Sequence, residues 1–434
     1  MKKELELFLC GLDLGTTAIK GVIIDQNGTI IAEGTKNNSM IVLGNDRFEI
    51  NPEEQYRMVC SLIKELAEKT PGKIAALSMA VASGNLLFTD ADGKPLTNII
   101  SWMDRRAAQD PPKVLSHLTS TEVRQITGWS CLDSFPLAQL AWFQENKPEL
   151  YNKASRYCMN SDWLLFRLTG KWQMDYSTAT TSHLQDQRTF TYHKEYLKLL
   201  NIEEKNLSLL VPTARFVGTV ISSAVEDTGL SESTKVVSGS FDHPSSARGA
   251  NINEPGQLML SCGTSWVGFF PEKDRQKIIN LGLLCDPFLA SEGGPWGAIF
   301  SVPYIGRMID WYIDNLIALG NENKYEVFNH LASKAHPGAG GLKIDLRKEP
   351  VLLKASPENI SRAVMENAAE LLNEEIQRLL SKGIKFNHVI IVGGVSKSKI
   401  WIKIIEEITA LKIEISSSYA GARGAAIVAG FGVK

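Results

Sequence analysis

Two short segments of the chain combine residue types that can hold a phosphate group. Residues 12–17 read Leu-Asp-Leu-Gly-Thr-Thr and residues 260–265 read Leu-Ser-Cys-Gly-Thr-Ser, so each apolar run ends in a glycine and two hydroxyl residues. Such a turn offers backbone N–H groups and hydroxyl donors without a bulky side chain, which main-chain binding of a phosphate requires. Gly-Thr is also ordinary turn chemistry. The pair of turns suggests two lobes that close on a nucleotide.

A carboxylate stands inside the first of these segments. At the mouth of a strand beside a phosphate site, Asp13 can hold Mg²⁺, directly or through its water molecules. The alternative for Asp13 is a turn or cap residue, but a plain β-turn has no need of a carboxylate there. The sequence therefore predicts Mg²⁺ near Asp13.

The composition is that of an ordinary globular enzyme. The chain has 434 residues, of which 44% are hydrophobic and 22% charged, and this length predicts two or three domains. A net charge of −2 gives no electrostatic footprint for nucleic acid or for an anionic membrane surface. We therefore expect neither nucleic acid nor membrane as a partner.

The cysteines and histidines bear on the expected cell location and on the expected kind of metal site. Six scattered cysteines form no Cys-x-x-Cys pair, which favours reduced thiols and a cytoplasmic protein over a disulfide framework or a zinc site. Seven histidines show no metal-ligand spacing, so a catalytic transition metal is not expected. Residues 1–14 lack a signal-peptide core, and no apolar run is long enough to cross a bilayer.

The first 90 residues mix strand-like and helix-like patterns, which predicts an α/β lobe. The strand-like runs are 7–14, 21–24, 29–33, 74–80 and 86–89. The first three are joined by turns, with Asp-Gln-Asn-Gly at 25–28 as a hairpin signal, and so predict an antiparallel meander. Residues 52–69 predict a helix. Residues 107–210 are mostly helical in pattern and predict an insertion in this lobe.

The second half contains another strand that feeds a helix through glycines. Residues 258–270 predict a strand, a turn and a strand, and residues 360–381 a long amphipathic helix. Residues 386–392 predict a buried strand, followed by a turn at Gly393 and Gly394 and a helix through residue 408 that Ser396 caps.

In an open α/β sheet, nucleotides bind at such a crevice at the carboxyl ends of strands, although a plain turn is the alternative. Neither Gly-x-Gly-x-x-Gly nor a Walker A motif is present. The small residues 421–426 predict a helix that another backbone approaches closely.

These segments, in this order and spacing, resemble the FGGY carbohydrate kinases almost from end to end. The segments that carry the resemblance are 13–17, 92–96 with 102–106, 134–146, 168–170 with 175–177, 239–242, 262–265 and 393–394. The resemblance implies an α/β protein with the two-lobed actin/Hsp70/sugar-kinase fold, which is ribonuclease H-like and has an interdomain active-site cleft. It places a sugar- and phosphate-binding lobe at residues 1–247, with the insertion at about 107–210, and a nucleotide-binding lobe at 248–434.

The resemblance also assigns roles to residues. In this family an aspartate near the middle of the chain removes the proton from the sugar hydroxyl, and the matching residue is Asp242. Without the resemblance, Asp242 before His243 and Pro244 could be a turn residue. The implied nucleotide and phosphate ligands are Gly15, Thr16, Thr17, Gly263, Thr264, Ser265, Gly393, Gly394 and Ser396, with Asp13 near Mg²⁺. The implied substrate ligands are Ser83, Gly84, Trp102, Asp104, Asp242 and His243.

Several departures from the family pattern leave the chemistry credible and the sugar open. Xylulose kinases carry Gln-Met-His and glycerol kinases Gln-Arg-Glu where this chain has Ala82, Ser83 and Gly84, so the pocket floor is smaller and less charged. Residue 139 is glutamine where the family usually has lysine, and His243 stands where many relatives have glutamine or asparagine. The second family signature is poorly matched around 296–314, and residues 338–357 look abbreviated.

The sequence thus predicts an ATP- and Mg²⁺-dependent kinase that phosphorylates a hydroxyl of a small sugar, with a pentulose such as xylulose as the leading substrate. Gluconate, a tetrulose, fuculose or a polyol are alternatives. An actin-like ATPase or a catalytically idle nucleotide-binding regulator is the alternative of another class, because it would keep both Gly-Thr turns. A homodimer is common in the family, but no pattern in this sequence marks an interface.

Overall fold

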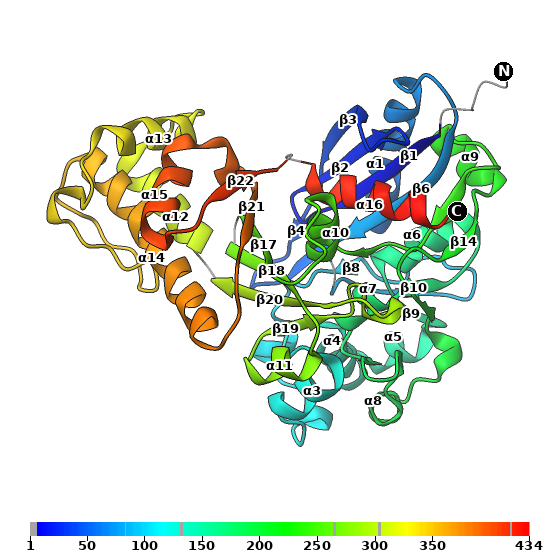
Figure 1. Cartoon of the computed structure of the whole chain (residues 1–434). Helices are drawn as coiled ribbons and strands as arrows, with labels where there is room; N and C mark the ends of the chain where they lie inside the picture. Colours follow the sequence, from blue (N-terminus) through cyan, green and yellow to red (C-terminus); the bar gives the residue numbers. More distant parts are fainter. Residues whose placement is uncertain are drawn as a thin grey trace. The chain divides into compact units, whose positions relative to one another are not determined.

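The computed structural model describes residues 7–82, 84–130, 133–263, 266–302, 305–416 and 419–433 (Figure 1). The predicted ligands Ser83, Thr264 and Ser265 lie outside the described residues. The chain divides into two compact units. The first comprises Met1–Asn251, Asp274–Gly297 and Tyr419–Lys434, and the second comprises Ile252–Lys273 and Ala298–Ser418. The last helix of the chain therefore belongs to the unit that contains the first strand.

The first unit is built on a sheet with the strand order β14-β15-β6-β1-β2-β3, in which β16 also pairs with β6. Its strands are β1 (Phe8–Leu14), β2 (Ala18–Ile24), β3 (Ile30–Asn37), β6 (Ile74–Val81), β14 (Phe216–Thr219), β15 (Lys235–Val237) and β16 (Ser240–Phe241). The antiparallel meander of β1, β2 and β3 is confirmed. Asp25 Oδ1 closes its second turn by accepting hydrogen bonds from the N–H groups of Asn27 and Thr29, both at 2.8 Å.

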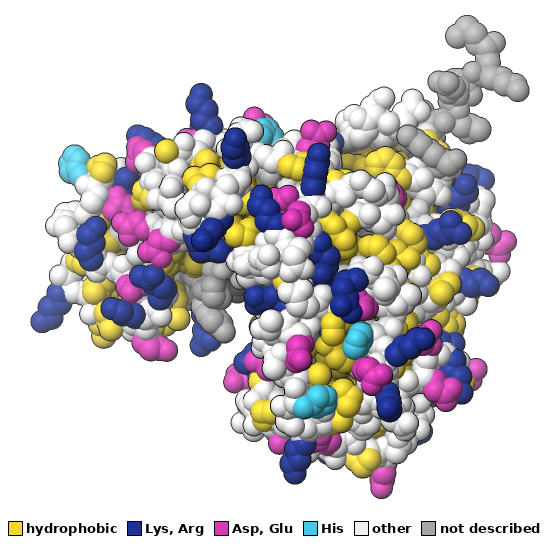
Figure 2. Space-filling model, turned by 60° about the horizontal axis from the view of Figure 1, so that its bottom comes forward, with side chains coloured by type: hydrophobic (Ala, Val, Ile, Leu, Met, Phe, Trp, Pro, Cys, Tyr) yellow, Lys and Arg dark blue, Asp and Glu magenta, His cyan; other side chains and the backbone are white. Residues whose placement is uncertain are grey.

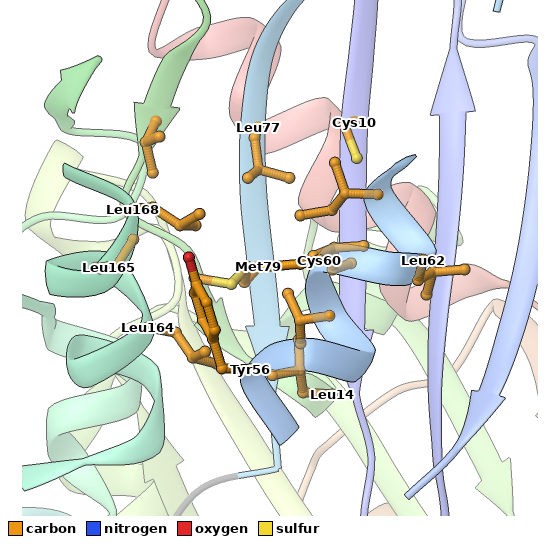
Figure 3. Packing of buried hydrophobic residues seen from close by; sticks show 14 of the residues in the cluster. Cys10, Leu14, Tyr56, Cys60, Leu62, Leu77, Met79, Leu164, Leu165 and Leu168 are labelled. Carbon is orange, nitrogen blue, oxygen red and sulfur yellow. The ribbon is translucent and has the colours of Figure 1, made fainter. Parts of the chain in front are cut away.

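Two helices cover opposite faces of this sheet. α1 (Pro52–Glu68) begins at Asn51, whose side chain accepts a hydrogen bond from Glu54 N, and it buries its apolar side on one face. α16 (Ala420–Phe431) packs against β1 and β6 on the other face. Figure 3 shows Cys10 and Leu14 of β1 in the core on the α1 side. Because side chains alternate along a strand, Gly11 and Asp13 face α16 instead.

Small residues let α16 approach the neighbouring backbone, as the sequence predicts. A Cβ atom built on Gly11 would lie 2.0 Å from the carbonyl oxygen of Ala422 in α16. One built on Gly249 of α10 (Asp242–Gly249) would lie 1.9 Å from the carbonyl oxygen of Ala420. No side chain fits between backbones this close. Glycine at these positions is therefore what allows β1 and α10 to pack directly against the backbone of α16.

The segment after residue 106 holds the predicted helices and also short strands that the sequence did not reveal. The helices are α2 (Arg106–Gln109), α3 (Ser120–Thr127), α4 (Pro136–Asn146), α5 (Pro148–Lys153), α6 (Asn160–Thr169), α7 (Tyr176–Thr180) and α8 (Lys194–Leu199). The strands are β9 (Arg156–Met159), β10 (Gln173–Asp175), β11 (Gln185–Asp186), β12 (Thr191–Tyr192) and β13 (Leu209–Val211). Strands this short carry too few residues to show an alternating pattern. The first unit continues with α9 (Ser222–Thr228), α11 (Arg275–Asn280) and β19 (Leu284–Asp286).

A smaller sheet in the first unit has the order β4-β5-β8-β7-β9. Its strands before residue 106 are β4 (Ile41–Val42), β5 (Phe48–Ile50), β7 (Leu86–Thr89) and β8 (Ile99–Ile100). β7 was predicted, and its buried Phe88 contacts the rings of Phe143 and Tyr157 at centroid distances of 4.9 and 5.3 Å. These aromatic contacts attach the helical segment to the sheet.

The second unit has the strand order β20-β18-β17-β21-β22. Its strands are β17 (Gln257–Cys262), β18 (Trp266–Glu272), β20 (Trp296–Val302), β21 (His388–Gly393) and β22 (Ile413–Ile415), and its helices are α12 (Ile305–Tyr312), α13 (Lys324–Lys334), α14 (Pro357–Ser381) and α15 (Lys399–Thr409). The predicted strand–turn–strand and the long amphipathic helix are confirmed as β17, β18 and α14.

The predicted cap at Ser396 is wrong. α15 begins at Lys399, and the side chain of Ser398 caps it by accepting a hydrogen bond from Trp401 N at 3.3 Å. Ser396 lies in the preceding short helix (Gly394–Lys397), and its hydroxyl donates to the carbonyl oxygen of Gly393 at 2.7 Å. The extra helical turn after the glycines moves the start of α15 by two residues.

Charged side chains of both signs are interspersed over the face shown in Figure 2. This mixture agrees with the net charge of −2. No helix among the described residues is both long enough and apolar enough to span a bilayer.

Candidate active site

Two strands bring Asp13 and Asp242 to the same edge of the first sheet. β1 and β16 both run parallel to β6 and flank it, and Asp13 and Ser240 are both register partners of Ala80. Asp242 follows two residues after Ser240 and begins α10. Two strands that lie on either side of the same strand are ~10 Å apart. Two carboxylates from distant parts of the sequence therefore meet where parallel strands end.

Burial and charge make Asp13 an unusual carboxylate. Its pKa is raised to about 7, first by burial and then by the negative charge of Asp242, while Lys20 lowers it. Lys20 is the register partner of Asp13 on β2. A Cβ atom on Gly421, in the first turn of α16, would lie 2.4 Å from Asp13 Oδ2. The carboxylate thus occupies space that only a glycine leaves open.

Asp242 has a buried carboxylate oxygen that no hydrogen bond satisfies. Oδ1 is buried without a partner among the described residues, although the side chain as a whole keeps 27% of its surface exposed. His243 Nδ1 is the nearest cation-forming atom, at 3.9 Å. Burial raises the pKa of Asp242, and His243 opposes that effect. An unsatisfied, more basic carboxylate at a sheet edge is suited to accept a proton from a ligand.

The first Gly-Thr turn presents hydroxyl groups beside Asp13. The N–H of Gly15 donates to the carbonyl oxygen of Ala18 at 3.0 Å, so this glycine offers no free N–H. Trp102 Nε1 lies 3.2 Å from Thr16 Oγ1. Because an indole N–H can only donate, Thr16 Oγ1 must accept, and the proton of its own hydroxyl is directed elsewhere. Thr16 and the exposed Thr17 are therefore the residues of this turn that can donate to a phosphate.

A series of aromatic contacts leads from Phe135 through Trp129 to Phe241, the residue before Asp242. A Cβ atom on Gly84 (φ +85°) would lie 2.5 Å from the ring of Phe135 and 3.2 Å from Trp102 Cβ. Phe135 contacts the ring of Trp129 at 5.5 Å, and Trp129 contacts Phe241 at 5.5 Å. The ring of Phe135 thus takes the space that a side chain at position 84 would need.

The expectation that Asp104 binds a sugar hydroxyl does not fit the structure. Asp104 is fully buried. Its Oδ1 accepts hydrogen bonds from Arg106 N and Nε, at 3.0 and 2.7 Å. Its Oδ2 accepts from Phe48 N and from Arg106 Nη2, at 3.0 and 2.8 Å. Both oxygens already accept two hydrogen bonds each, so Asp104 fixes the positions of Phe48 and Arg106. We therefore do not include Asp104 among the proposed substrate ligands.

In the second unit the two glycine turns lie side by side. β17 and β21 are adjacent parallel strands, and Cys262 is the register partner of Gly393. Gly263 follows the first strand and Gly394 the second. Gly393 has φ 90° and ψ −165°, a conformation essentially restricted to glycine. Cβ atoms on Gly263 and Gly394 would meet nothing within 4 Å, so both turns leave open space above the backbone.

Sequence reasoning missed two residues of the site. Lys20 carries no motif of its own, and only the strand register places it opposite Asp13. Phe135 lies in a segment that supported the family resemblance, but its contact with Gly84 depends on the tertiary fold. The signal that could have found Lys20 was the turn predicted between the first two strands, since the register of two strands can be counted from the turn that joins them.

Replacing Gly421 by alanine is expected to displace Asp13 without weakening the fold. The new Cβ would collide with Asp13 Oδ2, whereas alanine favours a helix over glycine by ~1 kcal/mol. A displacement of ~1 Å can cost about 100-fold in rate. We therefore expect a clear loss of kcat with an unchanged Tm. Gly430→Ala in the same helix, which meets only the end of the Leu9 side chain, is the control, and equal kcat values in both variants would contradict this role of Asp13.

Two family profiles match this chain. The profile described as "FGGY family of carbohydrate kinases, N-terminal domain" matches residues 8–249, and that of the C-terminal domain matches residues 331–433. Together they cover most of the chain. The chain belongs to the FGGY family of carbohydrate kinases. It is accordingly a phosphotransferase enzyme, and its mixed α/β architecture in two units is that of sugar kinases.

Relatives within this family act on several substrates. The chain is 26% identical to autoinducer-2 kinase of Salmonella typhimurium, over 98% of this chain and 86% of the relative. It is 25% identical to xylulose kinase of Bacillus subtilis, over 98% of this chain and 88% of the relative. The crystal structure of gluconate kinase from Lactobacillus acidophilus superposes with a TM-score of 0.85 at 23% identity, over 99% of this chain and 89% of that one. The family membership of this protein does not select among these substrates.

Proposed function

We propose that this FGGY kinase transfers the γ-phosphate of ATP to a hydroxyl of a small sugar, with Asp242 as the general base. The observation that carries the proposal is Asp242 Oδ1, a buried carboxylate oxygen without a hydrogen-bond partner among the described residues, beside Asp13 at the edge of the sheet. Phosphoryl transfer needs a carboxylate within hydrogen-bond reach of the attacking hydroxyl.

The surroundings of Asp242 suit this role. As the hydroxyl oxygen bonds to the γ-phosphorus, the bond from that phosphorus to the bridging oxygen of the β-phosphate breaks, ADP leaves, and the hydroxyl proton passes to Asp242 Oδ1. Burial raises the pKa of Asp242, so its carboxylate is a stronger base than an exposed aspartate. Lys20 places positive charge opposite Asp13, which lowers the cost of bringing an anionic phosphate there.

The nucleotide ligands are those expected from the sequence, except that the N–H of Gly15 is already bonded to Ala18. We assign the phosphates to Thr16 and Thr17 together with Gly263, Thr264 and Ser265, and the adenosine to Gly393, Gly394 and Ser396. Asp13 would hold Mg²⁺ through its water molecules. The described residues contain no group of three or more His, Cys, Asp or Glu side chains that could enclose a metal, which fits a Mg²⁺ ion that takes most of its ligands from water and phosphate. Bound Mg²⁺ supplies charge neutralisation at the phosphates.

The leading substrate is a pentulose such as xylulose. Position 84 bears no side chain, and the ring of Phe135 covers it, so this part of the surface offers apolar contact and no charge. Trp102, with 38% of its surface exposed, supplies a further apolar face, and His243 a polar group next to Asp242. An uncharged sugar fits these groups better than an aldonate such as gluconate. Gluconate, a tetrulose, fuculose and polyols remain alternatives, and Ser83 completes the proposed contacts.

The cell location and the assembly state are proposals as well. The five described cysteines are buried and unpaired, which supports the cytoplasm. A homodimer rests on the family resemblance, and light scattering of the purified protein tests it.

The decisive experiment measures ADP release from ATP–Mg²⁺ against a panel of ketoses, aldoses, polyols and aldonates, with a control that lacks sugar. We expect release that depends on one uncharged ketose and is absent without it. Release that requires gluconate would keep the kinase and exclude the pentulose. Release that is independent of every sugar would favour an actin-like ATPase, and no release at all a nucleotide-binding regulator.

A further inference from the structure

A buried hydrogen-bond chain ends at the residue that precedes Asp242. The N–H of Phe241 donates to Ser177 Oγ at 3.1 Å, and Ser177 Oγ donates to Asp286 Oδ2 at 2.7 Å. A hydroxyl has one proton, and a carboxylate can only accept. The proton of the Ser177 hydroxyl is therefore directed at Asp286. Ser177 Oγ must then accept from Phe241 N. The Asp286 carboxylate therefore fixes the orientation of the Ser177 hydroxyl, whose oxygen holds the turn into α10.

The other end of α10 is tied to the same loop. Asp286 Oδ1 accepts a hydrogen bond from Phe288 N at 2.7 Å, and the carbonyl oxygen of Phe288 accepts one from Arg248 Nη2 at 2.8 Å. Arg248 lies in the last turn of α10, six residues after Asp242, and its guanidinium stacks on the Phe288 ring at 4.6 Å. The loop Asp286–Phe288 thus holds both ends of the helix that begins with Asp242.

The loop adopts a strained backbone conformation where it contacts α10. Phe288 has φ 43°, in the left-handed region that bulky residues rarely adopt. Asp286 is fully buried and Arg248 is 5% exposed, so two charged groups have been removed from water as well. Strain and buried charge of this kind collect where a structure must hold a functional group in place. A loop that served stability alone would need neither.

We propose that Ser177 and Asp286 are positioning residues for Asp242, acting with Arg248 to hold α10 so that the Asp242 carboxylate stays at the edge of the sheet. This inference rests on the function of Asp242 proposed above. Burial raises the pKa of Asp286 to about 6, and Ser177, Phe288 N and Arg248 oppose the rise.

The test compares Ser177→Ala and Asp286→Asn with wild type. In Asp286→Asn one acceptor oxygen becomes an NH₂ donor, so the side chain cannot accept from both Phe288 N and Ser177 Oγ as before, and the Ser177 hydroxyl loses its fixed orientation. A base displaced by ~1 Å lowers the rate by about 100-fold. We expect kcat to fall ~10- to 100-fold in both variants, while KM for ATP changes less than twofold. The acid limb of the kcat–pH profile, which reports the base, should also shift.

A matched Ser–Asp pair in the same unit serves as the control. Ser208 Oγ donates to the fully buried Asp162 Oδ2 at 2.5 Å, and Asp162 Oδ1 accepts from Met159 N at 2.8 Å. This pair has the same chemistry and burial, but these hydrogen bonds join Ser208, Asp162 and Met159 and do not lead to α10. Ser208→Ala and Asp162→Asn are therefore expected to lower Tm like the other two variants and to leave kcat of the folded protein unchanged.

Three outcomes separate the proposals. If Ser177→Ala and Asp286→Asn lose no more kcat than Ser208→Ala and Asp162→Asn, the positioning role is wrong. If Asp242→Asn also keeps full turnover, the proposed function has failed with it. If Asp242→Asn is inactive and the two network variants behave as wild type, only the positioning role has failed. Should Asp286→Asn not fold, Ser177→Ala carries the test, because it removes a single hydroxyl.

Discussion

Replacing Asp242 by asparagine is expected to lower kcat by ~10²–10⁴-fold, the range that a general base contributes. The amide has nearly the shape of the carboxylate and cannot take the proton of the attacking hydroxyl. Oδ1 of Asp242 is buried without a partner among the described residues, so the substitution breaks no hydrogen bond of that atom in the free protein. The readout is ADP release under saturating ATP–Mg²⁺ and sugar, with ATP affinity measured by calorimetry.

Two further observations are expected from the same variant. ATP should bind with unchanged or higher affinity, because a negative charge next to the phosphates has been removed. The pKa of Asp13 should fall, since the charge of Asp242 is one of the causes that raise it. Asp227→Asn is the matched control, because it makes the same substitution on α9 and not on α10. Asp227 is exposed and accepts a hydrogen bond from Tyr56 OH. Turnover in Asp242→Asn equal to that of the control would exclude Asp242 as the base.

The second large effect is expected from Gly424→Ala, which should lower the free energy of unfolding by about 3 kcal/mol, the upper end of typical overpacking costs. A Cβ atom at residue 424 would lie 1.8 Å from the carbonyl oxygen of Ser245 and 3.0 Å from Gly249 N. Both atoms belong to the backbone of α10 and cannot rotate away, so α10 and α16 must move apart. The ~1 kcal/mol by which alanine favours a helix offsets only part of this cost.

Calorimetry and activity together test this effect. We expect a Tm several degrees below wild type, and a lower kcat at temperatures where the variant is folded, because α10 carries Asp242 at its first position. Gly430→Ala makes the same substitution in the same helix and meets only Leu9 Cδ1, at 2.9 Å, so it should stay close to wild type. Equal Tm values for the two variants would show that the close approach of the helices does not limit stability.

The comparison with Gly421→Ala sharpens the interpretation. Residues 421 and 424 are one turn apart on α16, yet the first faces the side chain of Asp13 and the second the backbone of α10. A side chain can rotate to admit a methyl group, whereas a helix backbone must shift as a whole. The first substitution should therefore reduce activity more than stability, and the second should reduce both.

The sequence alone predicted the chemistry and determined much of the fold. The turns around Gly15 and Gly393, the meander of β1, β2 and β3, the helix α1 and the small-residue helix α16 all follow from local patterns of apolar, glycine and turn residues. Asp13 and Asp242 were identified because a carboxylate next to a phosphate turn, or at a family position, has a specific chemical use. The signal at Asp13 is local in the chain, whereas the assignment of Asp242 rests on the family resemblance; neither needed tertiary information.

Only the tertiary structure decided how those residues are used. Asp104 looked like a sugar ligand in sequence, but the fold saturates both of its oxygens with Arg106 and Phe48. Ser396 looked like a helix cap, but an additional turn moves that role to Ser398.

Phe135 reaches Gly84 across 51 residues, and Asp286 reaches Ser177 across 109 residues. Contacts between residues so far apart depend on how the strands and helices pack, because loop closure brings together groups that share no local pattern. The tertiary structure therefore decides which polar groups remain unsatisfied and free to bind, and in this protein Asp242 Oδ1 is among them.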